Sequence, residues 1–459
     1  MNKRTIIASA SAPGRGGVSV VRMSGEKSKT IAERMCGELS EPWKFKKCSI
    51  MSSGDGVIDS GMVVFFQSPH SYTGEDVIEI ACHGSAYIIQ KIISCFLEEG
   101  VLPAQAGEFT LRAYLNKKMD LSQAEAVADI IASESAEAHR IAMQQMRGGF
   151  SKGMEVLRQQ LIQFKALIEL ELDFSEEEVN FADKSKLESL LKKLQHDISE
   201  LKNSFAYGNV IKKGVPVAIA GKPNVGKSSL LNALFNEDKA IVSPIAGTTR
   251  DSIEDTLIID GVQFRFIDTA GLRQTDDIIE SIGVQKAKEK VIQATVLLYL
   301  YDKSATVEDL VSEIKSLHHE KLHLIVIQNK IDLDPKGYDI EFSKQIAKKL
   351  DPKINLKLLG ITTIDKTTLG PLKTNLLETV QSIGNNSALV INNSRHYHAL
   401  NQALASIEIV KEGLKNDLSG DLLSIELKEA IEHIGTITGV IDTDQDVLGA
   451  IFSQFCIGK

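Results

Sequence analysis

The sequence predicts a multidomain α+β protein in which an α/β domain is inserted into a discontinuous helical-bundle domain. Three observations lead to this fold class. The first 118 residues alternate short β-like runs with turns. No proline lies between Pro103 and Pro216 or after Pro371, and apolar residues in both regions recur at helical spacing. Between these regions an apolar run enters a glycine-rich loop and then a helical pattern, as in a parallel α/β fold.

Length and composition bound the possible functions. The chain has 459 residues, too many for one hydrophobic core, so we expect two to four domains. No apolar stretch approaches the ~18 residues that a membrane span needs, so no membrane partner is expected. The net charge is 52 − 61 = −9. Proteins that bind nucleic acid over a large surface are usually basic, so any RNA contact should be local or shared with a partner.

The cysteines and the first residues predict a cytoplasmic protein. Five cysteines are present, an odd number with no Cys-x-x-Cys pair, which favours a reducing compartment without structural zinc. The first twelve residues resemble a signal peptide only superficially, because the apolar run is short and a Pro-Gly-Arg-Gly-Gly segment follows it.

The N-terminal α+β domain is predicted over residues 1–118. Its β-like runs cover 18–21, 61–66 and 76–81, and a helical run follows at 86–98. The helical domain is predicted in two parts, 119–213 and 379–459. Apolar residues at helical spacing mark both parts: Leu157, Leu161, Phe164, Ile168, Leu187, Leu191, Leu194, Ile198, Leu423, Leu427 and Ile434.

The inserted domain, 214–378, opens with a phosphate-binding loop. Residues 221–228 read Gly-Lys-Pro-Asn-Val-Gly-Lys-Ser, after an apolar strand at 215–220 and before a helical pattern at 229–235. Backbone N–H groups of such a loop point at phosphate oxygens. Lys227 can reach the β- and γ-phosphates, and the Ser228 hydroxyl can bind Mg²⁺. A chance glycine-rich turn would not have both the strand and the helix in place.

Two later motifs predict a Ras-like GTPase. An apolar strand at 263–267 leads into Asp-Thr-Ala-Gly at 268–271, where Asp268 reaches Mg²⁺ through water. A second strand leads into Asn-Lys-Ile-Asp at 329–332. The Asp332 carboxylate can accept from the N1–H and amine of guanine, which adenine does not offer. The residues expected to contact GTP are Asn224, Val225, Gly226, Lys227, Ser228, Ser229, Ser243, Pro244, Ile245, Ala246, Gly247, Thr248, Thr249, Asp268, Thr269, Ala270, Gly271, Asn329, Lys330 and Asp332.

The region between the motifs supplies the first switch loop, with Thr249 as the second Mg²⁺ ligand. Ras-type enzymes place a water-orienting Gln after Asp-x-x-Gly, but Leu272 stands here. Another group must therefore orient water and neutralise charge. Asn224 could help to hold a monovalent cation beside the phosphates. On the loop alone, Asn224 could equally be a turn-forming residue after Pro223.

Several segments along the whole chain resemble those of the tRNA modification GTPase MnmE family, also called TrmE. They are Ala-Pro-Gly-Arg-Gly-Gly at 12–17, Arg-Met-Ser-Gly at 22–25, Ser-Tyr-Thr-Gly-Glu-Asp at 71–76, His-Gly at 83–84, Ala-Gly-Glu-Phe-Thr-Leu-Arg-Ala at 106–113, Leu-Asn-Lys-Lys-Met-Asp-Leu at 115–121 and Phe-Ser-Gln-Phe-Cys-Ile-Gly-Lys at 452–459. The resemblance implies an N-terminal folate-binding-type domain, a helical domain and an inserted Ras-like P-loop GTPase domain.

The resemblance also implies a folate site and a homodimer. The positions that match the family's contacts to a tetrahydrofolate derivative, in 5-formyl or methylene form, are Arg22, Glu79, Lys118 and Lys459. Arg22 and Lys118 suit the anionic glutamate tail, and Glu79 suits the N–H edge of the pterin. Without the resemblance, these side chains would be interpreted as solvated surface charges.

For hydrolysis, the resemblance implies a bound K⁺ in place of an arginine finger. The matching K⁺ ligands are Asn224, Ser243, Ile245 and Thr248, and Glu280 matches the acid that orients water. Cys456 is either a nucleophile toward uracil or a tail cysteine that packs near the folate site. The family's third guanine-binding element is usually Ser-Ala-Lys, but residues 361–363 here read Ile-Thr-Thr.

The function implied is modification at C5 of the wobble uridine in certain tRNAs, with aminomethyl or carboxymethylaminomethyl products. By the same resemblance, this chain binds GTP, Mg²⁺ and K⁺. FAD is bound only by the partner, MnmG, with which this chain forms a hetero-oligomer. Two alternatives stay open: a regulatory switch that binds RNA or a ribosomal particle, and a folate-dependent transferase with a vestigial GTPase. The folate-type domain and the Cys-Ile-Gly-Lys tail argue against the first, which a test of folate binding would discriminate, and the intact nucleotide motifs argue against the second.

Overall fold

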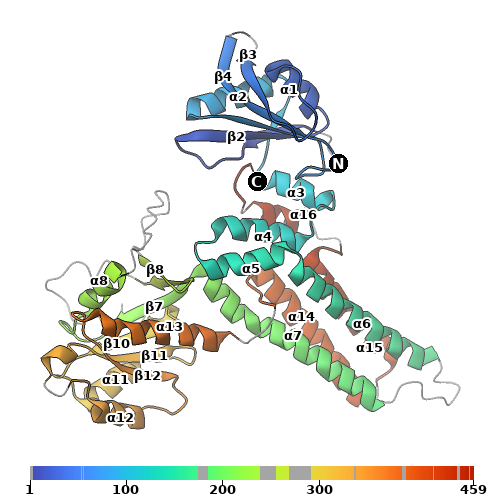
Figure 1. Ribbon diagram of the computed structural model, residues 1–459. Coiled ribbons are helices and arrows are strands. Elements are labelled where there is room, and N and C mark those ends of the chain that lie inside the picture. The colour runs from blue at the N-terminus through green and yellow to red at the C-terminus, as the bar shows by residue number, and fades with distance from the viewer. Residues whose placement is uncertain are drawn as a thin grey trace. The chain divides into compact units, whose positions relative to one another are not determined.

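The computed structural model describes residues 4–52, 54, 56–173, 184–237, 255–267, 291–334, 337–384, 389–416, 418–441, 445–453 and 455–458. The chain divides into two compact units, each described below by itself. The first unit comprises Met1–Ile131, Gln144–Phe181 and Leu418–Lys459, and the second comprises Ala132–Met143 and Ala182–Asp417. Each unit contains one sheet and several helices (Figure 1).

The first unit holds a six-stranded sheet in the order β3-β4-β5-β2-β1-β6. Its strands are β1 (Ile6–Ser9), β2 (Gly16–Ser24), β3 (Lys46–Ser52), β4 (Gly56–Phe66), β5 (Val77–Gly84) and β6 (Leu102–Pro103). Neighbouring strands are antiparallel except β1 and β6, which are parallel. The three β-like runs predicted from sequence correspond to β2, β4 and β5, which confirms them, although β5 begins one residue later.

Helices α1 (Ser28–Cys36) and α2 (Ala86–Glu98) pack on one face of this sheet. Helix α2 has the predicted bounds, because its apolar residues recur at helical spacing and its buried side chains include Ile92 and Phe96. Since side chains alternate along a strand, Val21 and Met23 of β2 join this core, whereas Arg22 lies on the opposite face. Arg22 is paired in register with Glu79 of β5 on that face.

The rest of the first unit is helical. It contains α3 (Glu108–Leu115), α4 (Leu121–Ala132), α6 (Gly149–Asp173), α15 (Gly420–Thr438) and α16 (Gln445–Phe452). Helices α6 and α15 pack against each other although they are far apart in sequence (Figure 1). The residues that predicted helix α6 by their spacing are buried, as expected: Leu157, Leu161, Phe164 and Ile168.

The C-terminal segment packs against the N-terminal part of the first unit. Phe452 and Phe455 join a small apolar cluster with α4, and Ile457 forms an isolated bridge with Ala106. A Cβ built on Gly458 would lie 1.9 Å from the carbonyl oxygen of Ser9, so only glycine fits there. The segment therefore runs directly beside the end of β1.

The second unit holds a six-stranded sheet in the order β12-β11-β10-β7-β9-β8. Its strands are β7 (Val215–Ala220), β8 (Asp255–Ile259), β9 (Val262–Phe266), β10 (Val296–Tyr301), β11 (His323–Gln328) and β12 (Leu356–Gly360). All neighbours are parallel except β8 and β9, which form a hairpin. The central strand β10 is buried throughout, as a parallel strand covered on both faces should be.

Helices cover both faces of this sheet. Helices α8 (Lys227–Glu237) and α13 (Leu369–Ile383) share one core, and α11 (Val307–Leu317) and α12 (Ile340–Lys349) share the other. Two short 3₁₀ helices, η2 (Ile331–Leu333) and η3 (Lys366–Thr368), follow β11 and β12. This is the predicted Ras-like α/β fold with a phosphate loop after β7.

Among the described residues, the second unit also contains helices outside its α/β fold: α7 (Lys184–Lys213), α14 (Ser394–Lys415) and most of α5 (Ala136–Met146), whose last three residues belong to the first unit. Helices α7 and α14 pack together. Ile141 of α5 and Ile211 of α7 are buried in the same core as strands β7 to β9. The α/β fold therefore shares its core with α5 and α7. None of the described helices is long and apolar enough to cross a membrane.

Candidate functional sites

The loop between β7 and α8 has the backbone of a phosphate-binding loop. Gly221 and Gly226 have φ angles of 139° and 94°, which disfavour side chains. A Cβ on Gly221 would lie 2.2 Å from the Leu300 carbonyl oxygen, and one on Gly226 would lie 2.2 Å from Asn329 Nδ2. Asn224 is left-handed at φ 63°, a conformation that asparagine tolerates better than most residues.

Lys227 stands at the first position of α8, where the helix N-terminus favours anions. Its ammonium group donates to the carbonyl oxygens of Gly221 and Lys222, each at 2.8 Å. Burial lowers the pKa of Lys227 below its ordinary value. Ser228 and Ser229 follow in the first turn of the helix. The loop thus places the Lys227 ammonium beside a helix N-terminus, which is a suitable environment for phosphate.

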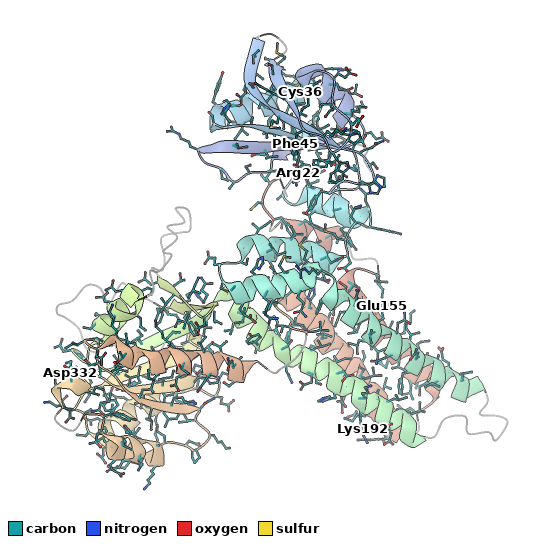
Figure 2. The ribbon with its side chains drawn as sticks, viewed as in Figure 1. Arg22, Cys36, Phe45, Glu155, Lys192 and Asp332 are labelled. Carbon is teal, nitrogen blue, oxygen red and sulfur yellow. The ribbon has the colours of Figure 1, made fainter. Side chains whose placement is uncertain are left out.

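The Asn-Lys-Ile-Asp segment follows β11 and lies against the phosphate loop. The Asn329 side chain is buried, and its Nδ2 donates to the Val225 carbonyl oxygen at 2.8 Å. Lys330 is left-handed at φ 59°, and its ammonium donates to the Asn224 carbonyl oxygen at 2.6 Å. Asp332 lies exposed on η2 (Figure 2). Two side chains therefore join the predicted base-binding segment to the predicted phosphate-binding loop.

Residues 361–363 lie at the same edge of the sheet, because β11 and β12 are parallel neighbours. The Ile361 N–H donates to the Gln328 carbonyl oxygen at 2.8 Å, and Ile331 N–H donates to the Ile361 carbonyl oxygen at 3.3 Å. In the described part of the chain, the Thr363 N–H has no hydrogen-bond partner. Residues 361–363 therefore lie beside the predicted base-binding segment, although their side chains depart from the usual pattern.

Many of the predicted nucleotide and ion contacts lie outside the described residues. These are Ser243, Pro244, Ile245, Ala246, Gly247, Thr248, Thr249, Asp268, Thr269, Ala270, Gly271 and Glu280, together with Leu272. The described part therefore contains the phosphate loop, the base-binding segment and one of the two predicted Mg²⁺ ligands, Ser228.

The first unit brings Arg22 and Glu79 together on the face of its sheet opposite α1 and α2. Arg22 Nε donates to Glu79 Oε1 at 2.8 Å, and Arg22 Nη2 lies 2.8 Å from the same oxygen. The guanidinium carbon also lies 5.2 Å from the centroid of the Tyr72 ring and 5.7 Å from that of Phe109. Such stacking holds a guanidinium in one orientation. Arg22 and Glu79 were predicted as separate ligand contacts, and in the structure each is the other's partner.

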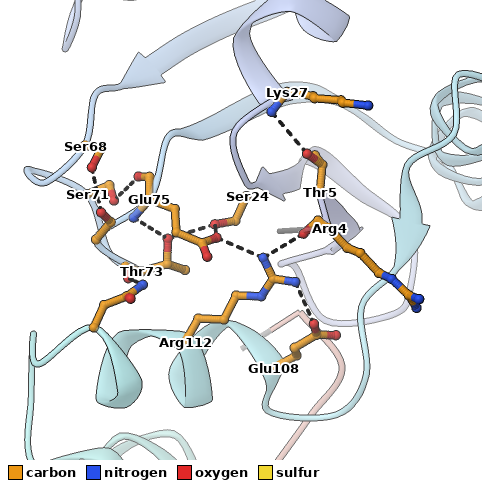
Figure 3. A network of polar contacts seen from close by, with 12 residues as sticks. Arg4, Thr5, Ser24, Lys27, Ser68, Ser71, Thr73, Glu75, Glu108 and Arg112 are labelled. Atoms are coloured by element: carbon orange, nitrogen blue, oxygen red, sulfur yellow. Dashed lines mark hydrogen bonds and ion pairs between the residues drawn. The ribbon is translucent and has the colours of Figure 1, made fainter. Parts of the chain in front are cut away.

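A polar network fixes the 67–76 loop that carries Tyr72 (Figure 3). Arg112 donates to Glu75 at 2.9 Å and to Glu108 at 2.8 Å, and its own side chain is only 11% exposed. Ser24 Oγ donates to Glu75 Oε2 at 2.8 Å and contacts Thr73 Oγ1 at 2.8 Å. The network joins β2, the loop and α3. Ser24, Thr73, Glu75, Glu108 and Arg112 fall in the motifs at 22–25, 71–76 and 106–113, and motif membership is the signal that could identify them.

Lys118 also contacts this loop. Its ammonium donates to the Pro69 carbonyl oxygen at 2.9 Å, and its stem packs beside Gly74. Of the four predicted folate contacts, Arg22 and Glu79 therefore lie on β2 and β5, and Lys118 contacts the 67–76 loop. The fourth, Lys459, lies outside the described residues. Cys456 is an exposed free thiol whose backbone carbonyl accepts from the Gly107 N–H at 3.5 Å.

The strand order of the second sheet, and the contact between the phosphate loop and residues 329–332, define a P-loop domain of the guanine-nucleotide-binding class. Family models match most of the chain: "MnmE helical domain" over residues 121–456 and "GTP-binding protein TrmE N-terminus" over residues 5–118. Similar curated proteins, each named tRNA modification GTPase MnmE, come from Flavobacterium johnsoniae (46% identical, 100% of both chains covered) and Christiangramia forsetii (47% identical, 99% of both). The chain belongs to the MnmE (TrmE) family.

Solved structures give a weaker likeness. The G domain of the FeoB iron transporter from T. maritima is 24% identical, with 36% of this chain and 99% of that chain covered and a TM-score of 0.27. A score this low carries no argument. The assignment of the α/β fold rests instead on the strand order and the loop geometry.

Proposed function

We propose that this chain is a K⁺-stimulated, Mg²⁺-dependent GTPase of the cytoplasm that acts in tRNA modification. The observation that carries the proposal is the direct bonding between the two predicted nucleotide-binding segments. Asn329 donates to Val225 and Lys330 donates to Asn224, so the segment that would bind guanine supports the loop that would bind phosphate. Relatives named tRNA modification GTPase MnmE match along the full length.

The ions are assigned by residue chemistry and by family resemblance. Ser228 and Thr249 are proposed to bind Mg²⁺ through their hydroxyls, and bound Mg²⁺ would neutralise phosphate charge. Asn224, Thr248 and the carbonyls of Ser243 and Ile245 are proposed to bind K⁺. Glu280 would orient the attacking water, because Leu272 has no group that can do so. The exposure of Asn224 in the loop supports a side chain available to a ligand.

A tetrahydrofolate derivative is proposed to bind near Arg22, Glu79, Lys118 and Lys459 and to supply a one-carbon unit. A homodimer of this chain, with an FAD-dependent partner, would use that unit at C5 of a wobble uridine in certain tRNAs. The chemistry of the described residues supports such a ligand. The Glu79 carboxylate, with Arg22 bonded to it, suits the N–H edge of the pterin, Lys118 suits the glutamate tail, and Tyr72 offers an aromatic surface beside Arg22.

The first experiment measures GTP hydrolysis by the purified protein in matched K⁺ and Na⁺ buffers, each with Mg²⁺. Much faster turnover in K⁺ is expected. Glu280→Ala should bind GTP normally and hydrolyse it slowly, while Glu341→Ala, an exposed glutamate on α12, serves as the matched control. Equal slow rates in K⁺ and Na⁺ would remove the K⁺ assignment, and normal turnover by Glu280→Ala would remove Glu280 from its role.

A second experiment tests the folate site by calorimetric titration with 5-formyltetrahydrofolate. Micromolar binding is expected, with a loss of at least tenfold in Glu79→Gln because a carboxylate that accepts two N–H bonds is replaced. Absence of binding would favour the alternative of a regulatory switch that performs no modification.

A further inference from the structure

The tip of the β8–β9 hairpin contacts the start of helix α5. Asp260 and Gly261 form the two-residue turn, with φ angles of 44° and 79°. The Gly261 carbonyl oxygen accepts a hydrogen bond from the Glu137 N–H at 3.0 Å. A Cβ on Gly261 would lie 3.1 Å from the Ala136 Cβ, so the turn and the helix are in close contact.

This contact caps the helix. The first N–H groups of an α-helix have no acceptor within the helix. In α5, the Ser135 hydroxyl accepts from the Ala138 N–H at 3.2 Å, and the hairpin carbonyl accepts from the Glu137 N–H. The hairpin therefore supplies an acceptor that the helix cannot supply itself, and withdrawal of the hairpin would leave the Glu137 N–H without it.

Side chains strengthen the same contact. Gln263 Nε2 of β9 donates to Glu134 Oε2 at 2.7 Å. The Glu137 carboxylate accepts from the Tyr207 hydroxyl of α7 at 2.9 Å and from Arg140, and hydrogen bonding by Arg140 lowers the pKa of Glu137. One turn of α5 is thus joined to the hairpin on one side and to α7 on the other.

The position of the hairpin in the chain gives this contact its significance. Strand β8 begins at Asp255, after the predicted first switch loop, and β9 ends at Phe266, just before the Asp-Thr-Ala-Gly motif. Strand β9 is also the neighbour of β7, which leads into the phosphate loop. Residues Ala132–Met143 belong to the second unit, whereas Gln144 and the residues after it belong to the first. Helix α5 is therefore a continuous segment shared between the units.

We propose that the β8–β9 hairpin transmits the nucleotide state of the GTPase fold to helix α5 by making or releasing this cap. The proposal rests on the GTP binding proposed above. A displacement of β8 or β9 that follows a change of nucleotide is carried along the hairpin to Gly261 at its turn. The first turn of α5 then gains or loses its external acceptor.

Hydrogen exchange of the α5 amides in the full-length protein tests the proposal. The protein is saturated with GDP or with a non-hydrolysable GTP analogue, and peptides covering 134–143 are followed by mass spectrometry. The Glu137 amide is the direct reporter, because its acceptor is the hairpin carbonyl. We expect exchange rates that differ by about three- to tenfold between the two nucleotide states, the range for one net hydrogen bond.

Two variants separate coupling from folding. Gln263→Ala with Glu134→Ala removes the side-chain contact, and Ala136→Leu places a larger side chain against the turn. Both should reduce the difference between nucleotide states to less than twofold while nucleotide affinity changes little. The matched control is Gln195→Ala with Glu408→Ala, which removes a Gln–Glu bond between α7 and α14 and should leave the difference intact.

The outcomes are distinguishable from failure of the proposed function. If the protein binds both nucleotides and the α5 amides exchange equally in both states, the coupling is overturned while GTP binding stands. A difference that persists unchanged in both variants would also overturn it. If neither nucleotide binds, the proposed function fails and this inference fails with it.

Discussion

Asn329 allows a quantitative test of how the base-binding segment supports the phosphate loop. Asn329→Ala removes the donor to the buried Val225 carbonyl, which costs about 1–3 kcal/mol. Part of that cost is offset, because the same change removes Asn329 Oδ1, which is buried without a partner in the described structure. We therefore expect a net loss of about 1 kcal/mol in the free energy of unfolding.

Asn329→Asp should cost more. It places a carboxylate oxygen where an amide now donates, 2.8 Å from a carbonyl oxygen. An unpaired buried charge costs about 3–5 kcal/mol. Desolvation raises the pKa of such a carboxyl in the folded state, so the penalty is full at high pH and shrinks as the pH falls and the group is protonated.

Urea unfolding at pH 7 and pH 5, with fluorescent-GTP titration, measures both variants. GTP affinity should fall in the same order, with Asn329→Asp below Asn329→Ala. Asn355→Asp is the control, because its side chain lies at an exposed contact with His323, and it should change stability by less than about 0.5 kcal/mol. Equal losses for the two Asn329 variants, or an Asp variant as stable as the parent, would refute the reasoning.

Three further predictions concern other charged residues. Asp332→Asn should leave the free energy of unfolding unchanged, because the side chain is exposed. The ratio of GTP to XTP affinity should fall by at least about tenfold, and an unchanged ratio in a competition assay would contradict the proposed guanine contact. Hydrogen bonding by Arg140 lowers the pKa of Glu137, so the carboxylate stabilises the fold above its ordinary pKa of 4.5, and the stability difference between parent and Glu137→Gln in urea unfolding should shrink as the pH falls below that value. Arg112→Met should cost about 1–3 kcal/mol in urea unfolding, because it leaves the part-buried carboxylates of Glu75 and Glu108 without their cation; a loss below about 0.5 kcal/mol would contradict this.

Local patterns explain what could be predicted from the sequence. Strand β7 has the predicted bounds, and β9 differs from its predicted range by one residue at each end. The predicted helix after the phosphate loop is α8, which begins two residues earlier. These elements have clear periodicity and are bounded by glycine-rich turns. The contact between the phosphate loop and 329–332 could be expected, because parallel strands end at the same edge of a sheet.

Contacts between distant residues could not be predicted in the same way. Arg22 and Glu79 pair because β2 and β5 are antiparallel neighbours in one particular register, which no local pattern specifies. The hairpin contact joins Glu137 to Gly261, and neither residue has a sequence signal that anticipates the other. The short strands β1 and β6 were also not predicted, because four and two residues contain too little alternation.

The pairing of α6 with α15 has a consequence for synthesis of the protein on the ribosome. The six strands of the first sheet are all available once Pro103 has been made. Helix α6 ends at Asp173, but its partner begins at Gly420, 420 − 173 = 247 positions later. While the intervening GTPase fold is being translated, the apolar face of α6 containing Leu157, Leu161 and Phe164 lacks this partner. We expect the nascent helix to be a binding site for chaperones and a source of aggregation in chains arrested before residue 420.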